Sequence, residues 1–369
     1  HLPQSVVIRA IMSLRPRAHI HLSNIADNWR TIQAAQVTGL TGAVLKADAY
    51  GHGLPQVAET LHEAGCDYFF VAHSHEAEVA RATLGSHPEI FVLNGPSPDE
   101  EALYRENALI PVINSSFQFR TMADWLVDGV KMPRGYALHF DTGMNRLGLP
   151  PQDVAEIADA VQVQMPDLIM SHLACAEDEK NLLNGQQNEA LTELSRVFPH
   201  VPRSLANSSG VWLGADYHHA LSRPGIALFG GGHPPEGLIL KPGMTLEAPI
   251  LQVRQLDAGD TVGYGATWRA KETTLVATLA LGYGDGFPRS ASNKGFAILG
   301  GKRCAILGRV SMDLMTIDVT EAADLARPGV YAQLIGPDAG LEEQAALAGT
   351  IGYELTTGLT PRVKRIYES

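Results

Sequence analysis

The sequence is poor in cysteine, and the positions of its cysteines exclude a disulfide scaffold or a zinc knuckle. Cys66, Cys175 and Cys304 lie far apart, and no two of them form a C-x-x-C pair. An odd number of scattered cysteines does not pair into a disulfide framework and suits a reducing compartment best. We therefore expect a cytoplasmic protein without structural disulfides.

Long apolar runs and an excess of positive charge are also lacking. No apolar stretch is long enough to span a membrane as a helix. The 369 residues include 40 Asp and Glu against 28 Lys and Arg, so the net charge is -12. Nucleic acids and anionic membrane surfaces are themselves negative, so neither is expected as a partner. With 45% hydrophobic and 18% charged residues, the chain is expected to fold into a globular protein.

The first twelve residues are not expected to carry a targeting signal. Their apolar stretch at positions 6–8 is cut by Arg9, which makes it too short for the core of a signal peptide. We expect residues 1–12 to be an expression leader that precedes the folded protein.

Short apolar runs alternate with helical patterns across the first two thirds of the chain. Most of these runs are continuously apolar, as strands covered on both faces should be. Eight such strands with seven intervening helices predict an α/β fold, a (β/α)8 TIM-like barrel over residues 13–244. The predicted parallel strands are 43–46, 68–72, 90–94, 109–113, 136–141, 168–173, 203–208 and 219–223.

The pattern changes near residue 245, where short strands are separated by glycine-rich turns. This pattern predicts a mainly β C-terminal domain over residues 245–369. An early strand at 18–22 precedes the barrel strands and is a candidate partner for this domain. The predicted strands are 250–255, 274–281, 296–299, 304–310 and 315–319, and helices are expected at 341–348 and around Tyr353.

A lysine ends the first barrel strand and is followed by a glycine-rich loop, A-V-L-K-A-D-A-Y-G-H-G at 43–53. The carboxyl ends of the strands carry the active site of a barrel. A lysine in that dry mouth loses part of its preference for charge, which Schiff-base chemistry requires. The alternative for Lys46 is an ordinary lysine that extends to solvent from a strand end.

Two segments after the last strands have the features of a phosphate site. In S-R-P-G-I at 222–226, Pro224 suits a first helical position and leaves the N–H groups of Gly225 and Ile226 free. N-S-S-G at 207–210 supplies hydroxyls at the same rim. Barrels frequently bind phosphate after strands seven and eight, although each segment alone is an ordinary cap or turn. Together with Lys46 they favour a phosphorylated cofactor that carries an aldehyde.

A third segment, D-T-G-M-N-R-L-G at 141–148, places an arginine in a rim loop after the fifth strand. Arg146 there suits recognition of a carboxylate. His172, near the end of the sixth strand, points to the same mouth, with a buried core histidine as the alternative. The histidines at 73 and 75 have a spacing that suits a metal, but the carboxylates nearby look like helix surface residues, so no metal is expected.

The segments at 43–53, 141–148 and 223–226, together with V-G-Y-G-A-T at 262–267 and V-S-M-D at 310–313, resemble the alanine racemase family. Five such strings occur in the family's order along nearly the whole chain. The resemblance implies a barrel with a C-terminal β domain and a pyridoxal 5'-phosphate cofactor. It also implies alanine as substrate and a head-to-tail homodimer that shares its active sites between subunits.

The resemblance also implies roles for individual residues. Lys46 is similar to the Schiff-base lysine, which is one catalytic base, and Tyr264 is similar to the opposing base supplied by the partner subunit. Arg223 matches the residue facing the pyridine nitrogen, and His172 matches the histidine that supports it. The positions similar to phosphate-binding residues are Tyr50, Ser208, Gly225, Ile226 and Tyr353; those on the substrate side are Arg146 and, from the partner, Met312; and Tyr283 resembles an entrance tyrosine.

One position departs from the family pattern. Many members have a lysine seven residues before the arginine of the D-T-G-M motif, where it is carbamylated and holds that arginine. Here the position is His139, which forms no stable carbamate. Arg146 must then be positioned by another group, such as an anion or a nearby carboxylate.

The expected function is interconversion of L- and D-alanine, for peptidoglycan synthesis in the cell wall or for D-alanine breakdown. Three alternatives stay open at this point. One is a racemase of broader specificity that accepts an amino acid such as serine, and another is a decarboxylase of the related barrel class. The third is a barrel protein that binds pyridoxal phosphate without turnover.

Overall fold

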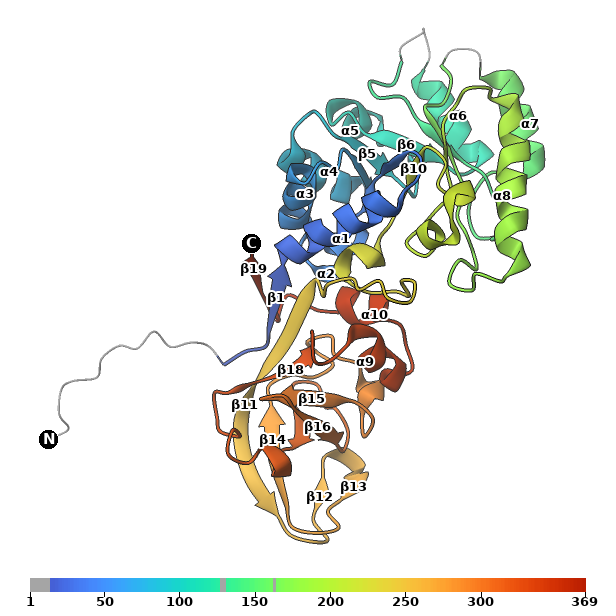
Figure 1. Cartoon of the computed structure of the whole chain (residues 1–369). Helices are drawn as coiled ribbons and strands as arrows, with labels where there is room; N and C mark the ends of the chain where they lie inside the picture. The colour runs from blue at the N-terminus through green and yellow to red at the C-terminus, as the bar shows by residue number, and fades with distance from the viewer. Residues whose placement is uncertain (1–13, 127–130, 162–163) are drawn as a thin grey trace, which may run out of the picture. The chain divides into compact units, whose positions relative to one another are not determined.

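The computed structural model describes residues 14–126, 131–161 and 164–369 (Figure 1). The predicted leader at 1–12 lies outside the described residues. The described chain forms two compact units, one from Ile20–Gly243 with the last three residues, the other from Met244–Ile366 with residues 14–19. No helix in the described ranges is long and apolar enough to cross a membrane.

The first unit is built on short parallel strands. A seven-stranded sheet runs in the order β3-β4-β5-β6-β7-β8-β9, and β10 pairs with β2 in parallel. Gly42 separates β2 from β3, and the N–H groups of Ala220 and Arg223 donate to the carbonyls of Arg203 and Ala206 on the β9 side. The strands are β2 Leu40–Thr41, β3 Ala43–Val44, β4 Tyr68–Val71, β5 Glu89–Val92, β6 Ile110–Ile113, β7 Ala137–His139, β8 Leu168–Met170, β9 Arg203–Ser204 and β10 Leu221–Ser222.

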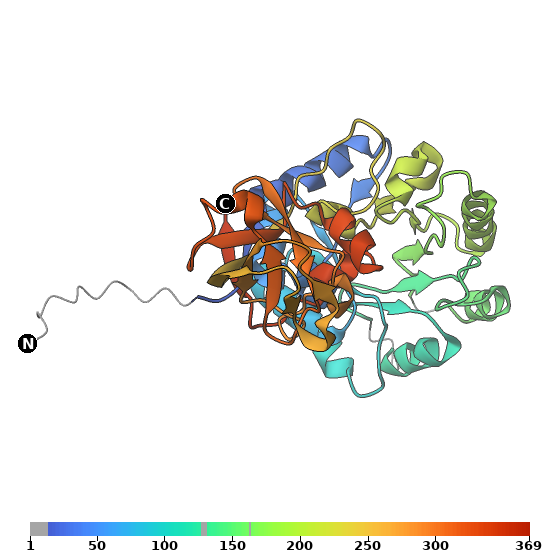
Figure 2. The ribbon, with the colours of Figure 1, turned by 90° about the horizontal axis from the view of Figure 1, so that it is seen from below.

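Helices cover the outside of these strands, as the helices coloured cyan to yellow-green show in Figure 2. The prediction of a seventh helix, between the strands at 203–208 and 219–223, is wrong. The connection from β9 to β10 contains two 3-10 turns instead, η3 Gly210–Leu213 and η4 Ala215–Tyr217. Gly214, with φ of 109°, separates them and leaves too short a segment for a regular helix. The helices are α1 Leu22–Ala35, α3 Leu54–Glu63, α4 Ser74–Leu84, α5 Glu101–Glu106, α6 Ser116–Trp125, α7 Pro151–Ala160 and α8 Leu182–Leu194, with η2 Ser195–Val197 and η5 Ile226–Phe229.

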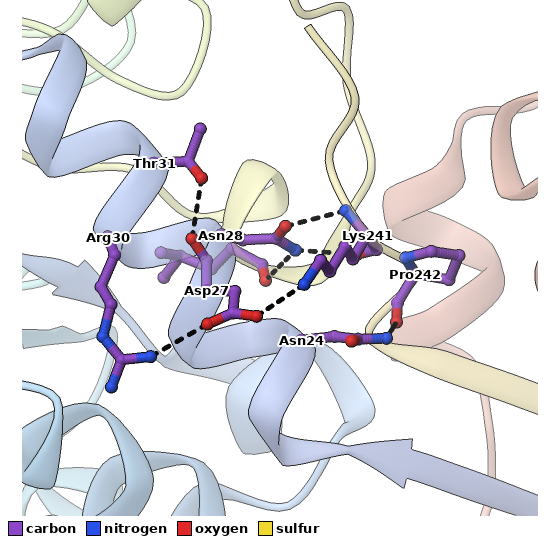
Figure 3. Close-up of polar contacts among 8 residues, drawn as sticks. Asn24, Asp27, Asn28, Arg30, Thr31, Lys241 and Pro242 are labelled. Carbon is purple, nitrogen blue, oxygen red and sulfur yellow. Dashed lines mark hydrogen bonds and ion pairs between the residues drawn. The ribbon is translucent and has the colours of Figure 1, made fainter.

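Helix α1 is tied to the segment that ends this unit (Figure 3). Asn28, which is buried, donates from Nδ2 to the carbonyls of Leu228 (3.0 Å) and Lys241 (2.8 Å) and accepts from the Lys241 N–H. Lys241 Nζ lies 2.6 Å from Asp27 Oδ2. Because Leu228 belongs to η5, this network fixes the turn that follows the candidate phosphate segment.

The second unit is an antiparallel β domain. Its sheet runs β14-β17-β16-β15-β18-β11-β1-β19, with a further pairing of β14 to β11. The strands are β1 Arg17–His21, β11 Met244–Leu256, β12 Thr261–Val262, β13 Trp268–Arg269, β14 Thr274–Leu279, β15 Phe296–Leu299, β16 Lys302–Leu307, β17 Met315–Asp318, β18 Tyr331–Ile335 and β19 Lys364–Glu368. The helical segments are η6 Tyr264–Ala266, η7 Arg289–Ala291, η8 Thr320–Ala322, α9 Leu341–Ala348 and α10 Gly352–Thr357.

The predicted fold class, a TIM-like α/β barrel followed by a C-terminal β domain, is confirmed. The sequence pattern missed strand β18, whose buried Ala332 and Leu334 alternate with partly exposed neighbours. Three of its five residues, Ala332, Gln333 and Leu334, are not among the residues enriched in strands, so its strand signal is weak.

Candidate active site

Lys46 lies just beyond the carboxyl end of β3 and directly precedes a left-handed turn. Residues 47–50 of the segment labelled α2 (Lys46–Gly51) have φ between 51° and 55°. The left-handed helix costs an L-residue about 1–2 kcal/mol, so other contacts must hold the turn. The Ala49 N–H donates to the Leu45 carbonyl at 2.8 Å, and His52 Nδ1 lies 2.9 Å from the Tyr50 carbonyl.

Charged groups surround the amine of Lys46. Its side chain is open to solvent at the mouth, yet the protein atoms around it lower the pKa of Lys46 from its usual value, and Arg146 lowers it further. Glu76 acts in the opposite direction and raises the pKa, while Arg223 lowers it. A lowered pKa makes the neutral amine of Lys46 easier to reach, and the neutral amine is the form that acts as a nucleophile and a base.

Arg223 follows β10 directly and is buried in a well-defined set of acceptors. Its guanidinium donates to Ser204 Oγ and to the Ser171 carbonyl, each at 2.5 Å, and lies 3.5 Å from His172 Nδ1. Burial lowers the pKa of Arg223 to about 10, so the guanidinium stays charged at neutral pH. Burial, and then the charge of Arg223, hold the pKa of His172 well below its usual range. His172 is therefore neutral and presents a lone pair to Arg223.

A small cradle lies between the loop after β9 and the start of η5. The Ser208 hydroxyl accepts from the N–H groups of Gly225 (2.9 Å) and Ala227 (3.3 Å). A side chain at Gly225 would begin where the Tyr50 hydroxyl lies, so only glycine permits this approach. Two hydroxyls and the backbone of η5 thus converge at one point, an arrangement that fits the phosphate of pyridoxal 5'-phosphate.

The loop that carries Arg146 is organised by a carboxylate. Asp141 Oδ1 accepts from the N–H groups of Gly143, Met144 and Asn145 at 2.9–3.1 Å. Arg146 itself is exposed, and within the described part of the chain no carboxylate forms an ion pair with it. The carboxylate expected as one possible holder of Arg146 is therefore absent from these residues.

His139, at the end of β7, has a defined tautomer. Asn114 Nδ2 donates to the carbonyls of Val112 and Leu93, so its Oδ1 faces His139 Nδ1 at 2.7 Å. Nδ1 must then carry the proton, and Nε2 is left as an acceptor. Burial, with Arg223 and Arg146 nearby, lowers the pKa of His139 to about 4. The position therefore holds a neutral imidazole.

The other expected site residues belong to the C-terminal unit. Tyr264 begins η6 and is 72% exposed, and Met312, between β16 and β17, is 53% exposed. The Met312 carbonyl accepts from the Gly284 N–H, and the Tyr283 N–H donates to the Ser311 carbonyl, so the loops of Tyr283 and Met312 are joined. A cavity of about 530 Å³ is lined by Tyr264 together with Arg309 and Ser311. Tyr353 lies on α10.

The first unit therefore brings together Lys46, Tyr50, His172, Ser208, Arg223, Gly225 and Ile226, with Arg146 on the adjoining loop. Sequence reasoning missed Glu76, Asn114, Ser171 and Ser204. The last three lie at or just after a strand end, so the rule that barrels carry function there would have drawn attention to them. Within the described ranges, no group of three or more His, Cys, Asp or Glu side chains is arranged to hold a metal.

Comparison with known proteins gives a family for both units. The family models for the N-terminal and C-terminal domains of alanine racemase match residues 20–233 and 243–367. Alanine racemase of Methylobacterium nodulans is 44% identical over 359 residues, or 95% of each chain. A catabolic alanine racemase of Agrobacterium fabrum is 42% identical over 94% of this chain and 91% of its own.

Solved structures agree with the sequence relatives. Alanine racemase from Bartonella henselae, with covalently bound pyridoxal phosphate, has a TM-score of 0.90 at 34% identity and covers 96% of this chain and 99% of its own. The biosynthetic alanine racemase of Pseudomonas aeruginosa has a TM-score of 0.89 at the same identity and coverage. A strand-end lysine, a cradle that fits a phosphate and two matched domains lead to one conclusion: this chain belongs to the alanine racemase family.

Proposed function

We propose that this chain interconverts L- and D-alanine with pyridoxal 5'-phosphate held at Lys46. The observation that carries the proposal is the position of Lys46 at a barrel strand end, with a lowered pKa and two arginines close by. The family membership supports the same reaction. The product would supply D-alanine for peptidoglycan or enter D-alanine breakdown.

The residues of the first unit would hold the cofactor. Tyr50, Ser208, Gly225 and Ile226 would bind its phosphate, and Tyr353 of the other unit is assigned to the same group. Arg223, supported by His172, would face the ring nitrogen. When bound, pyridoxal phosphate supplies an aldehyde that joins an amine and a ring that delocalises the electron pair left when the α-proton is removed.

Racemisation needs a proton removed on one face of the α-carbon and returned on the other. Lys46 would exchange that proton on one face as a neutral amine, for which its lowered pKa prepares it. Tyr264 would exchange the proton on the opposite face through its phenol oxygen. Arg146 and Met312 would contact the substrate, with Arg146 acting on its carboxylate.

We further propose a homodimer in which Tyr264 and Met312 complete the site of the partner subunit. The exposure of both side chains, and of the nearby apolar Leu314, supports a surface that is covered in the assembly. A cytoplasmic location is supported by the three free cysteines.

The activity test is proton NMR of L-alanine in deuterated buffer with purified protein and added pyridoxal phosphate, followed by chiral analysis. We expect loss of the α-proton signal together with formation of D-alanine. Exchange without inversion would leave Lys46 as a base and remove Tyr264 from the role of second base. No exchange would overturn the proposed reaction, and release of carbon dioxide would replace it with decarboxylation.

A second candidate, a racemase of broader specificity, is favoured by His139. Where many family members have a carbamylated lysine, which is negatively charged, this chain has a neutral imidazole close to Arg146. The charge next to the substrate side of the site therefore differs from that of those members. Turnover of alanine, serine and lysine measured side by side separates the two. A kcat/KM for serine close to that for alanine would favour the broader enzyme.

A further inference from the structure

Glu76 links the helix after β4 to the residue after Lys46. It lies in the first turn of α4, where its Oε2 accepts from the N–H groups of Ala72 (2.8 Å) and His73 (3.1 Å). Its other oxygen, Oε1, accepts from the Ala47 N–H at 2.6 Å. One carboxylate therefore joins two segments that are 29 residues apart in the chain.

Capping of α4 explains only half of these contacts. A glutamate at the third helical position commonly accepts from the N-cap N–H, as Glu76 does from His73. That role uses one oxygen and involves no residue outside the helix start. The bond to Ala47 is different, because Ala47 is the first residue of the left-handed turn (φ 54°, ψ 53°).

Glu76 also acts on the charge of Lys46. The groups that interact electrostatically with this amine are Arg146 from the loop after β7, Arg223 after β10, the neutral His172 after β8, and Glu76 from α4. The protein atoms around Lys46 and both arginines disfavour its charged form. Among these groups, Glu76 is the one that favours it.

We propose that Glu76 is a positioning residue for Lys46: one carboxylate oxygen caps the start of α4 while the other holds the left-handed turn after Lys46, so that a negative charge is fixed one residue away from this lysine. The proposal rests on the proposed function, in which Lys46 gains and loses a proton in each cycle. An amine that never recovers a proton could not return one to the α-carbon.

The test measures the charge of Lys46 in the full chain before cofactor is added. The rate of Lys46 acetylation by acetic anhydride is followed against pH by mass spectrometry of the Lys46 peptide, with a free amine as internal standard. In Glu76→Gln we expect the midpoint of this profile to move to lower pH. Glu78→Gln, the same change at an exposed site two residues along α4, should leave the midpoint unchanged.

The direction of the shift separates this role from a purely structural one. Loosening of the fold would admit water, relieve the desolvation of Lys46 and move the midpoint to higher pH. Loss of a nearby negative charge moves it to lower pH. A midpoint that rises or stays constant in Glu76→Gln overturns the charge role.

Glu76→Asp separately tests the tether, which is the hydrogen bond from the Ala47 N–H to Glu76. This variant also serves if Glu76→Gln does not fold. Aspartate keeps the charge but is one methylene shorter, so it cannot reach both α4 and Ala47. We expect the Lys46 midpoint near that of the unchanged protein, with faster hydrogen exchange at the Ala47 N–H. Unchanged exchange there overturns the tether.

These readouts are independent of the proposed function. Alanine turnover by the unchanged protein tests the racemase reaction by itself. A chain without that activity, but with the expected shift in Glu76→Gln, would overturn the function and keep Glu76 as a positioning residue. An active chain without the shift in Glu76→Gln would keep the proposed function and overturn the charge role of Glu76.

Discussion

Arg223 and His139 show how single residues set the electrostatics of the barrel mouth. Arg223 stays charged although it is buried, because serine and carbonyl oxygens accept its protons. His139 stays neutral, because burial and two arginines disfavour its protonation. Each residue is thus held in one protonation state near neutral pH, and each leads to a prediction.

Arg223→Glu should increase transamination relative to racemisation. Arginine holds its proton and cannot give it to the ring nitrogen, which keeps the ring a moderate electron sink. A carboxyl group can share a proton with that nitrogen, so return of a proton at the wrong carbon becomes easier. We expect the ratio of pyruvate to inverted alanine to rise by about tenfold, which corresponds to about 1.4 kcal/mol of barrier. Unchanged partitioning would contradict the assignment of Arg223 to the ring nitrogen.

His139→Gln should change how stability depends on pH. The folded-state pKa of His139 is about 4, below the unfolded value of about 6.5. The unfolded chain therefore binds the proton first, and stability from this group is complete above pH 6.5 and is lost as pH falls toward 4. The group accounts for a loss of up to about 1.4 kcal/mol per pH unit in that range.

Glutamine does not titrate, so the variant avoids that loss. Urea unfolding at pH 7, 6 and 5 measures the free energy of unfolding of both proteins. We expect the variant to compare least well with the unchanged protein at pH 7, and the difference in free energy to narrow as pH falls. His219, whose pKa is also lowered to about 4, is present in both proteins and cancels. A difference that is constant with pH would mean that folding leaves the pKa of His139 unchanged, and would contradict its lowered value.

At the scale of elements, the left-handed turn after Lys46 is the least ordinary piece of backbone. Ala47, Asp48, Ala49 and Tyr50 all adopt positive φ, and none is glycine. Glu76, Leu45 and His52 hold the turn through hydrogen bonds. The strain lies next to the lysine that is proposed to hold the cofactor, and such strain is typical of functional sites.

Ala47→Gly should stabilise the chain, whereas the same change in an ordinary helix should not. Glycine enters the left-handed region without the Cβ clash, so we expect a gain of about 0.5–1 kcal/mol at position 47. Ala155, exposed on α7, is the matched control, and Ala155→Gly should cost about 0.5–1 kcal/mol. Urea unfolding of both variants checks the signs. A loss of stability in both would show that Ala47 carries no strain.

At the scale of the whole molecule, the proposed dimer makes a prediction about how the subunits combine. Lys46→Ala and Tyr264→Phe should each abolish activity, because each removes one base from every site. If Tyr264 serves the partner's Lys46, a hybrid dimer of the two variants carries one intact site and one doubly altered site.

The two variants, co-expressed with different tags and purified through both, should give about half the activity of the unchanged dimer. If both bases came from the same subunit, neither site of the hybrid would be intact. An inactive hybrid of normal size and stability would therefore rule out the shared site.

Local patterns in the sequence predicted most strands and helices of the first unit and most residues of its candidate site. Continuous apolar runs marked the parallel strands, and polar residues at their carboxyl ends marked Lys46, Ser208 and Arg223. The C-terminal strands were predicted less completely, because β18 and β19 mix polar or charged residues with apolar ones and give a weak strand signal. The helix predicted between β9 and β10 does not form, because glycines interrupt that segment and leave two short 3-10 turns.

The sequence by itself determined which chemical groups lie at the strand ends, because strand, loop and cap signals are local and do not depend on distant partners. Only the tertiary structure decided the protonation states and the contacts between loops. Glu76 meets Ala47, and Asn114 sets the tautomer of His139, through separations of 29 and 25 residues. Such contacts have no local signature, because neighbouring strands of a barrel bring together side chains that the chain itself keeps apart.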